Sequence, residues 1–328
     1  MKTITYKGKT LETINWQPLT QEEFEQLKVE YYKKPDFTLV EKELINLKKG
    51  KVKYTSIEKY YFRELMSKVN LYHSKWCIED VFECKELLEF FYSKTLKNEK
   101  VFPKDKPLIS NIETAIRLGG KGVASKPSNF PIKHVDEIIE KYNVNGNYYD
   151  PCCGWGVRLM SALRNNVNYF GTDPNFLLVD KLNELCGDYK RVNRENGAMV
   201  DIRATGSEIK HNDWVGKMGL CFTSPPYFNL EDYKVGEQSW KEGDSYEKWL
   251  DCYLKPTLDN IKSYLIDGGY LAININNFAN YNLVQDVKTI AKEKGFNYVT
   301  THELKNIQRT NSNGGFNDNR EGIMVFQK

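Results

Sequence analysis

The stretch YYDPCCGWGVRL (residues 148–159) joins a short apolar run to an amphipathic run through two glycines. The first run ends on an acid, Asp150, and the following turn contains Gly154 and Gly156, which allow the backbone to approach a ligand closely before a helix starts. Such a strand, turn and helix unit binds a nucleoside-containing cofactor at the carboxyl edge of a parallel sheet. A tight turn without a ligand is the alternative, because the spacing lacks the third glycine of a dinucleotide fingerprint.

From residue 130 onward, strand and helix patterns alternate along the chain. Strands are expected at 147–150, 169–172, 198–203, 219–223, 270–275, 296–304 and 323–326. Helices are expected at 131–142, 157–165, 176–188, 246–266 and 283–295. The alternation predicts an α/β fold with a doubly wound, mostly parallel seven-stranded sheet whose last two strands form a closing hairpin.

The first 115 residues differ from the rest in composition and in the spacing of their apolar residues. Residues 20–100 are rich in Glu, Lys and Leu at helical spacing, so we predict a mainly helical N-terminal region over 1–115. The segment 116–128 is rich in Gly, Ser and Lys and is expected to be a loop. The second domain is then expected to span 116–328.

Composition narrows the class of protein. The chain has 328 residues, with 47 basic and 44 acidic side chains and a net charge of +3, so a nucleic-acid-binding face is expected only as a local patch. The start of the chain lacks the apolar core of a signal peptide, no apolar run is long enough to cross a membrane, and the seven cysteines include no CxxC pair. These features predict a soluble intracellular protein with no membrane segment and no metal site.

Acids follow two further strands at the same edge of the expected sheet. Asp173, after the second strand, is placed to accept hydrogen bonds from both ribose hydroxyls of a nucleoside lying over the glycine turn; capping of the next helix is the alternative. Glu208, after the third strand, is expected where an adenine amino group would lie. Asn212 and Asp213 are nearby competitors for that role.

The fourth strand ends on TSPPYF (residues 223–228). The two prolines make a rigid turn, in which no following amide can bond to the carbonyl of Pro225 because Pro226 has no N–H. This carbonyl and the hydroxyl of Ser224 can accept both hydrogens of an exocyclic amino group and aim its nitrogen lone pair at a methyl donor. Tyr227 can stack on the planar base that carries the amino group.

With these two motifs in this order, residues 116–328 resemble the DNA amino-methyltransferases that use S-adenosylmethionine and carry a [DNS]-PP-[YFW] motif. The SPPY form at 224–227 resembles the N4-cytosine type, found in restriction-modification enzymes and in phage-encoded orphan methyltransferases. The extended match SPPYFNLEDY, with YFGTDPN at 169–175 upstream, resembles the phage-encoded proteins in particular.

The resemblance implies a Rossmann-like class I methyltransferase fold, S-adenosylmethionine as cofactor, DNA as partner, and a cytoplasmic location in a bacterial or phage-infected cell. It also implies direct in-line transfer of a methyl group to an exocyclic amine of a flipped base, for which we predict cytosine N4. Adenine N6 is the near alternative, followed by RNA or a modified phage base. A catalytically idle module that binds cofactor or DNA in a regulatory role is the alternative of another class.

Residues of the family's cofactor site carry over by position. Asp150, Cys152, Gly154 and Gly156 correspond to its cofactor turn, and Asp173 to its ribose-binding acid. The turn departs from the commoner DPFGGG or DPFGSG sequences of the family, since two cysteines and a tryptophan intervene here. The resemblance also assigns a segment beside the methionine moiety, formed by Phe130, Pro131 and Lys133.

Contacts to the nucleic acid are expected outside these motifs. Only about seventy residues separate the cofactor turn from the SPPY motif, so by elimination the recognition element is expected in residues 1–115. The residues expected to contact substrate are Phe228, Lys121, Lys126 and Trp240. A flexible surface linker is the alternative for the two lysines, and a structural role in its loop is the alternative for Trp240.

One cysteine motif points to a different chemistry. Pro151 and Cys152 resemble the Pro-Cys pair of cytosine C5 methyltransferases, whose thiolate attacks the base ring. Here the pair lies in the predicted cofactor turn, where no base would reach it. We therefore do not predict nucleophilic catalysis by cysteine.

Overall fold

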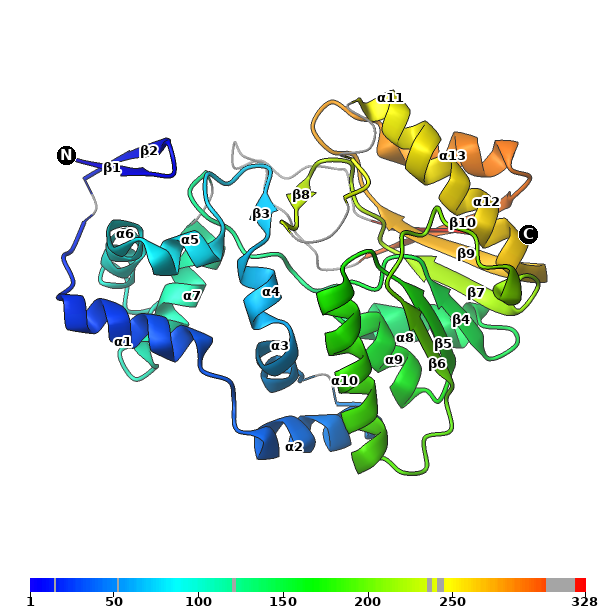
Figure 1. The fold of residues 1–328 in the computed structure, drawn as a ribbon, viewed down its shortest axis with the longest axis horizontal. Helices are drawn as coiled ribbons and strands as arrows, with labels where there is room; N and C mark the ends of the chain where they lie inside the picture. Colours follow the sequence, from blue (N-terminus) through cyan, green and yellow to red (C-terminus); the bar gives the residue numbers. More distant parts are fainter. Residues whose placement is uncertain (15, 52, 120–121, 235–237, 241–244, 305–321) are drawn as a thin grey trace. The chain divides into compact units, whose positions relative to one another are not determined.

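The computed structural model describes residues 1–14, 16–51, 53–119, 122–234, 238–240, 245–304 and 322–328. They form two compact units (Figure 1). The first unit comprises Met1–Asp36, Glu58–Ser128 and Glu231–Lys234, and the second comprises Phe37–Ile57, Asn129–Leu230 and Val235–Lys328. The units differ from the division expected at 115/116, because 116–128 belong to the first unit and 37–57 to the second.

The second unit contains the sheet. Its seven strands among the described residues are β4 (Asn147–Asp150), β5 (Asn168–Thr172), β6 (Val200–Arg203), β7 (Met218–Thr223), β9 (Leu265–Ile275), β10 (Asn297–Glu303) and β11 (Gly322–Gln327). They lie in the order β10-β11-β9-β7-β4-β5-β6, in which β11 is antiparallel to both of its neighbours and the pairs from β9 to β6 are parallel. The predicted doubly wound, mostly parallel seven-stranded sheet of the Rossmann-like class is confirmed.

Helices cover the sheet of this unit on both faces (Figure 1). The helices of this unit are α8 (Ile132–Tyr142), α9 (Val157–Arg164), α10 (Phe176–Val192), α11 (Tyr246–Trp249), α12 (Lys255–Tyr264), α13 (Leu283–Glu293) and α2 (Phe37–Lys48), of which α2 packs against α10 and α9. The central strand β7, MGLCFT, is buried along its whole length, as expected for a parallel strand covered on both faces. Such a strand consists of an unbroken run of apolar residues. Packing on both faces fixes the position of its carboxyl end.

The prediction of one long helix at 246–266 is wrong in the middle of this range and at its end. A π-helical turn at Leu250–Leu254 separates α11 from α12. Leu265 pairs with Met218 and begins β9, so the glycines at 268 and 269 lie inside the strand instead of ending the helix. They occupy the irregular part of the β7–β9 ladder, where Gly268 has a φ of 78° that favours glycine.

The first unit is mainly helical and adds two small sheets. Its helices are α1 (Gln21–Tyr32), α4 (Arg63–Ser67), α5 (Ile78–Glu83), α6 (Lys85–Thr95) and α7 (Leu108–Gly119), while α3 (Thr55–Tyr61) begins in the second unit and ends in the first. The sheets are the hairpin β1 (Lys2–Tyr6) with β2 (Lys9–Thr13), and the pair β3 (Asn70–Leu71) with β8 (Glu231–Asp232).

The loop predicted at 116–128 starts too early. Helix α7 continues to Gly119, because Ile112, Ala115 and Ile116 keep the helical spacing of buried apolar side chains. In the described part of the chain, no helix is both long enough and apolar enough to span a membrane.

Candidate active site

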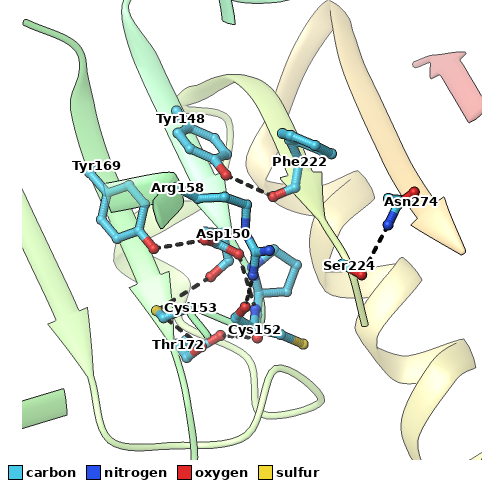
Figure 2. A network of polar contacts seen from close by, with 11 residues as sticks. Tyr148, Asp150, Cys152, Cys153, Arg158, Tyr169, Thr172, Phe222, Ser224 and Asn274 are labelled. Carbon is cyan, nitrogen blue, oxygen red and sulfur yellow. Dashed lines mark hydrogen bonds and ion pairs between the residues drawn. The ribbon is translucent and has the colours of Figure 1, made fainter. Parts of the chain in front are cut away.

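The carboxyl ends of β5, β4, β7 and β9 are neighbours in the sheet of the second unit. They bring Asp173 and the glycine turn to one edge together with Ser224 and Asn274, the latter two shown beside Asp150 in Figure 2. The sequence expectation that the two motifs meet at this edge holds because β4 pairs with β7 directly.

The turn after β4 has the backbone conformation that its glycines suggest. Gly154 and Gly156 have φ values of 56° and 76°, in the left-handed region that favours glycine. The N–H of Gly156 donates to the carbonyl of Gly154 at 2.9 Å, and Gly156 is the N-terminal cap of α9. The N–H of Cys153 donates to the carbonyl of Thr172 at 3.2 Å, which ties the turn to β5.

Asp150 points into the protein below this turn. Its carboxylate is fully buried and accepts hydrogen bonds from Arg158 Nε at 2.8 Å and from the Tyr169 hydroxyl at 2.7 Å (Figure 2). Burial raises the pKa of Asp150, while the charge and hydrogen bond of Arg158 oppose the rise. Arg158 also donates to the carbonyl of Cys152. Asp150 therefore shapes the turn through protein partners.

Asp173 lies across the same turn and is half-buried. Its carboxylate accepts the N–H of Asn175 at 3.0 Å and is hydrogen-bonded to the backbone of Gly154. Burial raises its pKa to about 6, although these backbone hydrogen bonds oppose the shift. The capping alternative for Asp173 is wrong, because the side chain of Asn175 caps α10 by accepting the N–H of Leu178 at 3.2 Å.

The three candidates after β6 differ in their surroundings. Glu208 is half-buried, and its carboxylate lies so close to Gly206 that a Cβ there would be 2.0 Å from Oε1. Asp213 is exposed and pairs with Arg203, whose Nη1 lies 3.0 Å from Oδ1; this hydrogen bond lowers the pKa of Asp213 to about 2. Asn212 is exposed at the start of a short 3-10 helix. Glu208 remains the acid beside the glycine-containing part of this loop.

Cys152 contacts a residue that the sequence analysis missed. Its Sγ lies 3.1 Å from the hydroxyl of Tyr253, which belongs to the π-helical turn before α12. π-helical turns occur frequently at functional sites. Burial raises the pKa of Cys152 to about 12, so a thiolate is disfavoured at neutral pH. This agrees with the expectation that Cys152 is no nucleophile.

The Ser-Pro-Pro-Tyr segment is held by the neighbouring strand β9. Asn274 Nδ2 donates to Ser224 Oγ at 3.3 Å (Figure 2), and the Tyr227 hydroxyl donates to the carbonyl of Asn274 at 3.4 Å. Pro225 is buried, while Ser224, Pro226 and Tyr227 are half-buried. The segment thus leaves the sheet as a fixed turn.

Phe228 has a different position from the one expected. It is 6% exposed, has a φ of 54°, and packs edge-on against the rings of Tyr246, Trp249 and Tyr281 at 5.6, 5.9 and 5.2 Å. Phe228 therefore anchors the segment in the core of the second unit and presents no open face. The expected contact of Phe228 with substrate is therefore corrected to a packing role. The sequence TSPPYF alone does not show which of its two aromatic side chains is buried.

Part of the second unit is similar to a known protein family. Residues 218–328, about a third of the chain, match the N6_N4_Mtase family model, described as DNA methylase. This segment is thus similar to DNA methylases. The predicted enzyme class, a DNA methyltransferase acting on adenine N6 or cytosine N4, and the predicted cofactor, S-adenosylmethionine, are thereby confirmed. The comparison with curated proteins finds no match.

Several solved structures are similar to the chain. A TehB-like SAM-dependent methyltransferase from Corynebacterium glutamicum has 14% identity and a TM-score of 0.40, covering 59% of this chain and 86% of its own. A putative rRNA-methylase from Clostridium thermocellum has 13% identity and a TM-score of 0.41, with coverages of 62% and 99%. A SAM-dependent O-methyltransferase from Thermotoga maritima has 10% identity and a TM-score of 0.40, with coverages of 61% and 66%.

The segment before α8 lies partly beside β7, the central strand of the second unit. The Phe130 ring meets the ring of Phe222 in β7 edge-on at 5.8 Å, and Pro131 precedes the first residue of α8. Lys133 differs from the expectation, because its side chain is 77% exposed and its Nζ lies 3.9 Å from Glu137. The structure brings Phe130, but not the amine of Lys133, next to the end of the sheet.

Contact with substrate was also predicted for Lys126, Lys121 and Trp240. Lys126 belongs to the first unit and forms an ion pair with Glu58. Lys121 lies outside the described residues. Trp240 packs partly buried on the core of the second unit and donates through Nε1 to Gln238 at 3.3 Å. Their contacts with nucleic acid stay predictions.

Proposed function

We propose that this protein transfers a methyl group to the exocyclic amine of a DNA base, with cytosine N4 as the preferred target. The observation that carries the proposal is the end of β7: Ser224, held by Asn274, precedes two prolines on the strand next to the glycine turn of β4. A hydroxyl and a carbonyl held rigidly at this place suit an amino group with two hydrogens to donate.

The residues at the edge fit S-adenosylmethionine by their chemistry. The half-buried carboxylate of Asp173, with its raised pKa, is suited to accept the two ribose hydroxyls, since such donors stabilise its ionised form. Gly154 and Gly156 allow close approach of a ligand, and Glu208 is suited to accept from an adenine amino group. The buried Thr223 Oγ1 and Asn229 Oδ1 have no hydrogen-bond partner within the described residues, which leaves polar atoms around the motif for a ligand or water.

The chain's own residues would then position the base and disperse charge. When bound, S-adenosylmethionine supplies an activated methyl group, whose bond to sulfur breaks with its electron pair left on the sulfur. Ser224 Oγ and the Pro225 carbonyl accept the two amino hydrogens, which turns the nitrogen lone pair toward the methyl carbon and stabilises the positive charge that develops. Tyr227 provides a ring for stacking. The nitrogen gains one bond to carbon and releases one proton to water, so neutral acceptors suffice.

The identity of the base rests on Ser224, the first residue of the motif. Cytosine N4 is our proposal because the motif has the SPPY form; adenine N6, RNA and a modified phage base are outcomes that the experiment separates. We further propose that residues 1–115 contain the DNA-recognition element, because 147–223 consists of the sheet and its connecting helices. Protection of phage DNA fits the form of the motif.

The test is methyl transfer from labelled S-adenosylmethionine to unmethylated duplex DNA, followed by digestion to nucleosides and mass spectrometry. We expect N4-methylcytosine, and a loss of roughly 10²- to 10³-fold in kcat for Ser224→Ala with cofactor affinity retained. Ser263→Ala is the matched control, because its hydroxyl bonds to the Asn260 carbonyl of its own helix. Unlabelled DNA would refute the proposal, and N6-methyladenine would replace its base assignment. Transfer unchanged by Ser224→Ala would refute the role of the motif.

A further inference from the structure

Asn274 contacts both ends of the Ser-Pro-Pro-Tyr segment. Its side chain donates to Ser224 at 3.3 Å, and its backbone carbonyl accepts from Tyr227 at 3.4 Å. It is 2% exposed and lies near the end of β9 (Figure 2). Two residues that lie 50 and 47 positions earlier in the chain are thus held by one residue of the neighbouring strand.

The position of Asn274 follows from strand register. Thr223 of β7 pairs with Ile273 of β9 in parallel, so the next residues, Ser224 and Asn274, lie level at the same edge. The residues before Asn274, from Leu271 to Ile273, are all buried and apolar. A primary amide in such a run is unfavourable unless it is hydrogen-bonded. The Nδ2 group of Asn274 meets this requirement through its bond to Ser224.

The bond defines which atoms of Ser224 remain for a substrate. A serine hydroxyl has one hydrogen to donate and two acceptor positions. The Asn274 amide occupies one acceptor position and fixes the rotation of the hydroxyl group, which leaves the second acceptor position and the hydrogen. An asparagine amide does not take up a proton near neutral pH, so Asn274 cannot draw the proton from Ser224.

We infer that Asn274 is a positioning residue for methyl transfer, which holds Ser224 as a neutral hydrogen-bond acceptor and excludes a proton relay through this serine. The inference rests on the proposed function. During transfer, Ser224 keeps its own proton, and the proton released by the methylated amine goes to water. Asn274 also fixes the distance between the acceptor at 224 and the ring at 227, because both bonds end on the same residue.

A double-mutant cycle in kcat tests the inference, with transfer measured at saturating S-adenosylmethionine. Asn274→Ala is expected to lower kcat roughly three- to tenfold, as for one neutral hydrogen bond, with unchanged cofactor affinity. In the Ser224→Ala background the same change is expected to have little further effect, since the acceptor that it positions is gone. Asn280→Ala is the control, because Asn280 is an exposed asparagine of the following turn. Equal losses in both backgrounds would overturn the inference.

Asn274→Asp gives a second, nearly isosteric measurement if the alanine variant unfolds. A carboxylate in this place accepts the Ser224 hydrogen, so we expect a new ionisation in the pH profile of kcat that the wild type lacks, and none in the Asn274→Asp, Ser224→Ala protein. Thermal unfolding and cofactor binding verify that each variant is folded. A wild type that already shows this ionisation, lost in Ser224→Ala, overturns the inference while leaving the proposed function intact. A wild type that labels no DNA overturns both.

Discussion

Asp173→Asn should stabilise the protein without cofactor while weakening its binding of cofactor. The folded protein holds Asp173 at a pKa of about 6, against 3.8 for an unburied aspartate, because burial disfavours the ionised form. The folded state therefore binds more protons than the unfolded state between these two values. Stability is highest with respect to this group below pH 3.8, and it falls as the pH rises through about 6.

The magnitude follows from the difference of about two pKa units, which corresponds to about 3 kcal/mol as an upper bound. The carboxylate is half-buried and its two backbone donors are only partly satisfied by an asparagine oxygen. We therefore expect Asp173→Asn to gain about 1 kcal/mol above pH 7. This gain corresponds to an unfolding midpoint about 2–4 °C higher, and it should disappear near pH 4.

The assay is thermal unfolding of cofactor-free protein at several pH values, paired with calorimetric titration of S-adenosylmethionine. Loss of a charged acceptor for two hydroxyls should weaken binding roughly 30- to 100-fold. Asp180→Asn is the matched control, because Asp180 is exposed on the next helix, α10. A variant that is less stable at pH 7 than the wild type, or one that binds cofactor normally, would refute the reasoning.

Three further substitutions separate folding roles from chemical ones. Arg158→Met leaves the buried Asp150 carboxylate without its charged partner, so denaturant unfolding should show a free energy of unfolding lower by about 3–5 kcal/mol. Adding Asp150→Asn should recover part of this loss, and no recovery would contradict the pairing. Cys152→Ala should keep methyl transfer within about tenfold, since a half-buried thiol with a raised pKa is no nucleophile, and a total loss in the same transfer assay would restore the covalent alternative. Phe228→Ala should lower the free energy of unfolding by about 3–5 kcal/mol with cofactor affinity retained; unchanged stability with weakened DNA binding would argue for the substrate contact after all.

The sequence predicted those parts of the fold that depend on local periodicity. The strands β4, β5 and β7 were found because each is a short apolar run before a Gly, Pro or acidic turn, and their helices because the apolar spacing is regular. The π-helical turn at Leu250–Leu254 was missed, since one extra residue in a single turn leaves the apolar spacing almost unchanged. The glycines at 268 and 269 directly follow the predicted helix, where glycine commonly ends a helix, but an irregularity inside a strand uses the same residue type.

Which chain segments belong to each of the two units could not be predicted, because this depends on contacts between residues distant in the sequence. Helix α2 belongs to the second unit because it forms packed helix pairs with α10 and α9, in which its Val40, Leu44 and Leu47 are buried. Such pairs have no signature in a single sequence. For the same reason Asn274 and Tyr253, which contact Ser224 and Cys152, were not found.

Asp150 and Asp173 show why site residues need the structure even where the motif is clear. Asp150 is the last residue of β4, Asp173 directly follows β5, and a proline follows each of them. The sequence therefore predicts both equally as cofactor-binding residues. Asp150 is fully buried against Arg158 and Tyr169, which satisfy its charge and its hydrogen bonds within the protein. Within the described residues, Asp173 accepts hydrogen bonds from backbone N–H groups and carries a raised pKa, so its ionised form gains most from donors that a ligand brings. Loss of the first carboxylate should therefore appear as unfolding, and loss of the second as weaker cofactor binding.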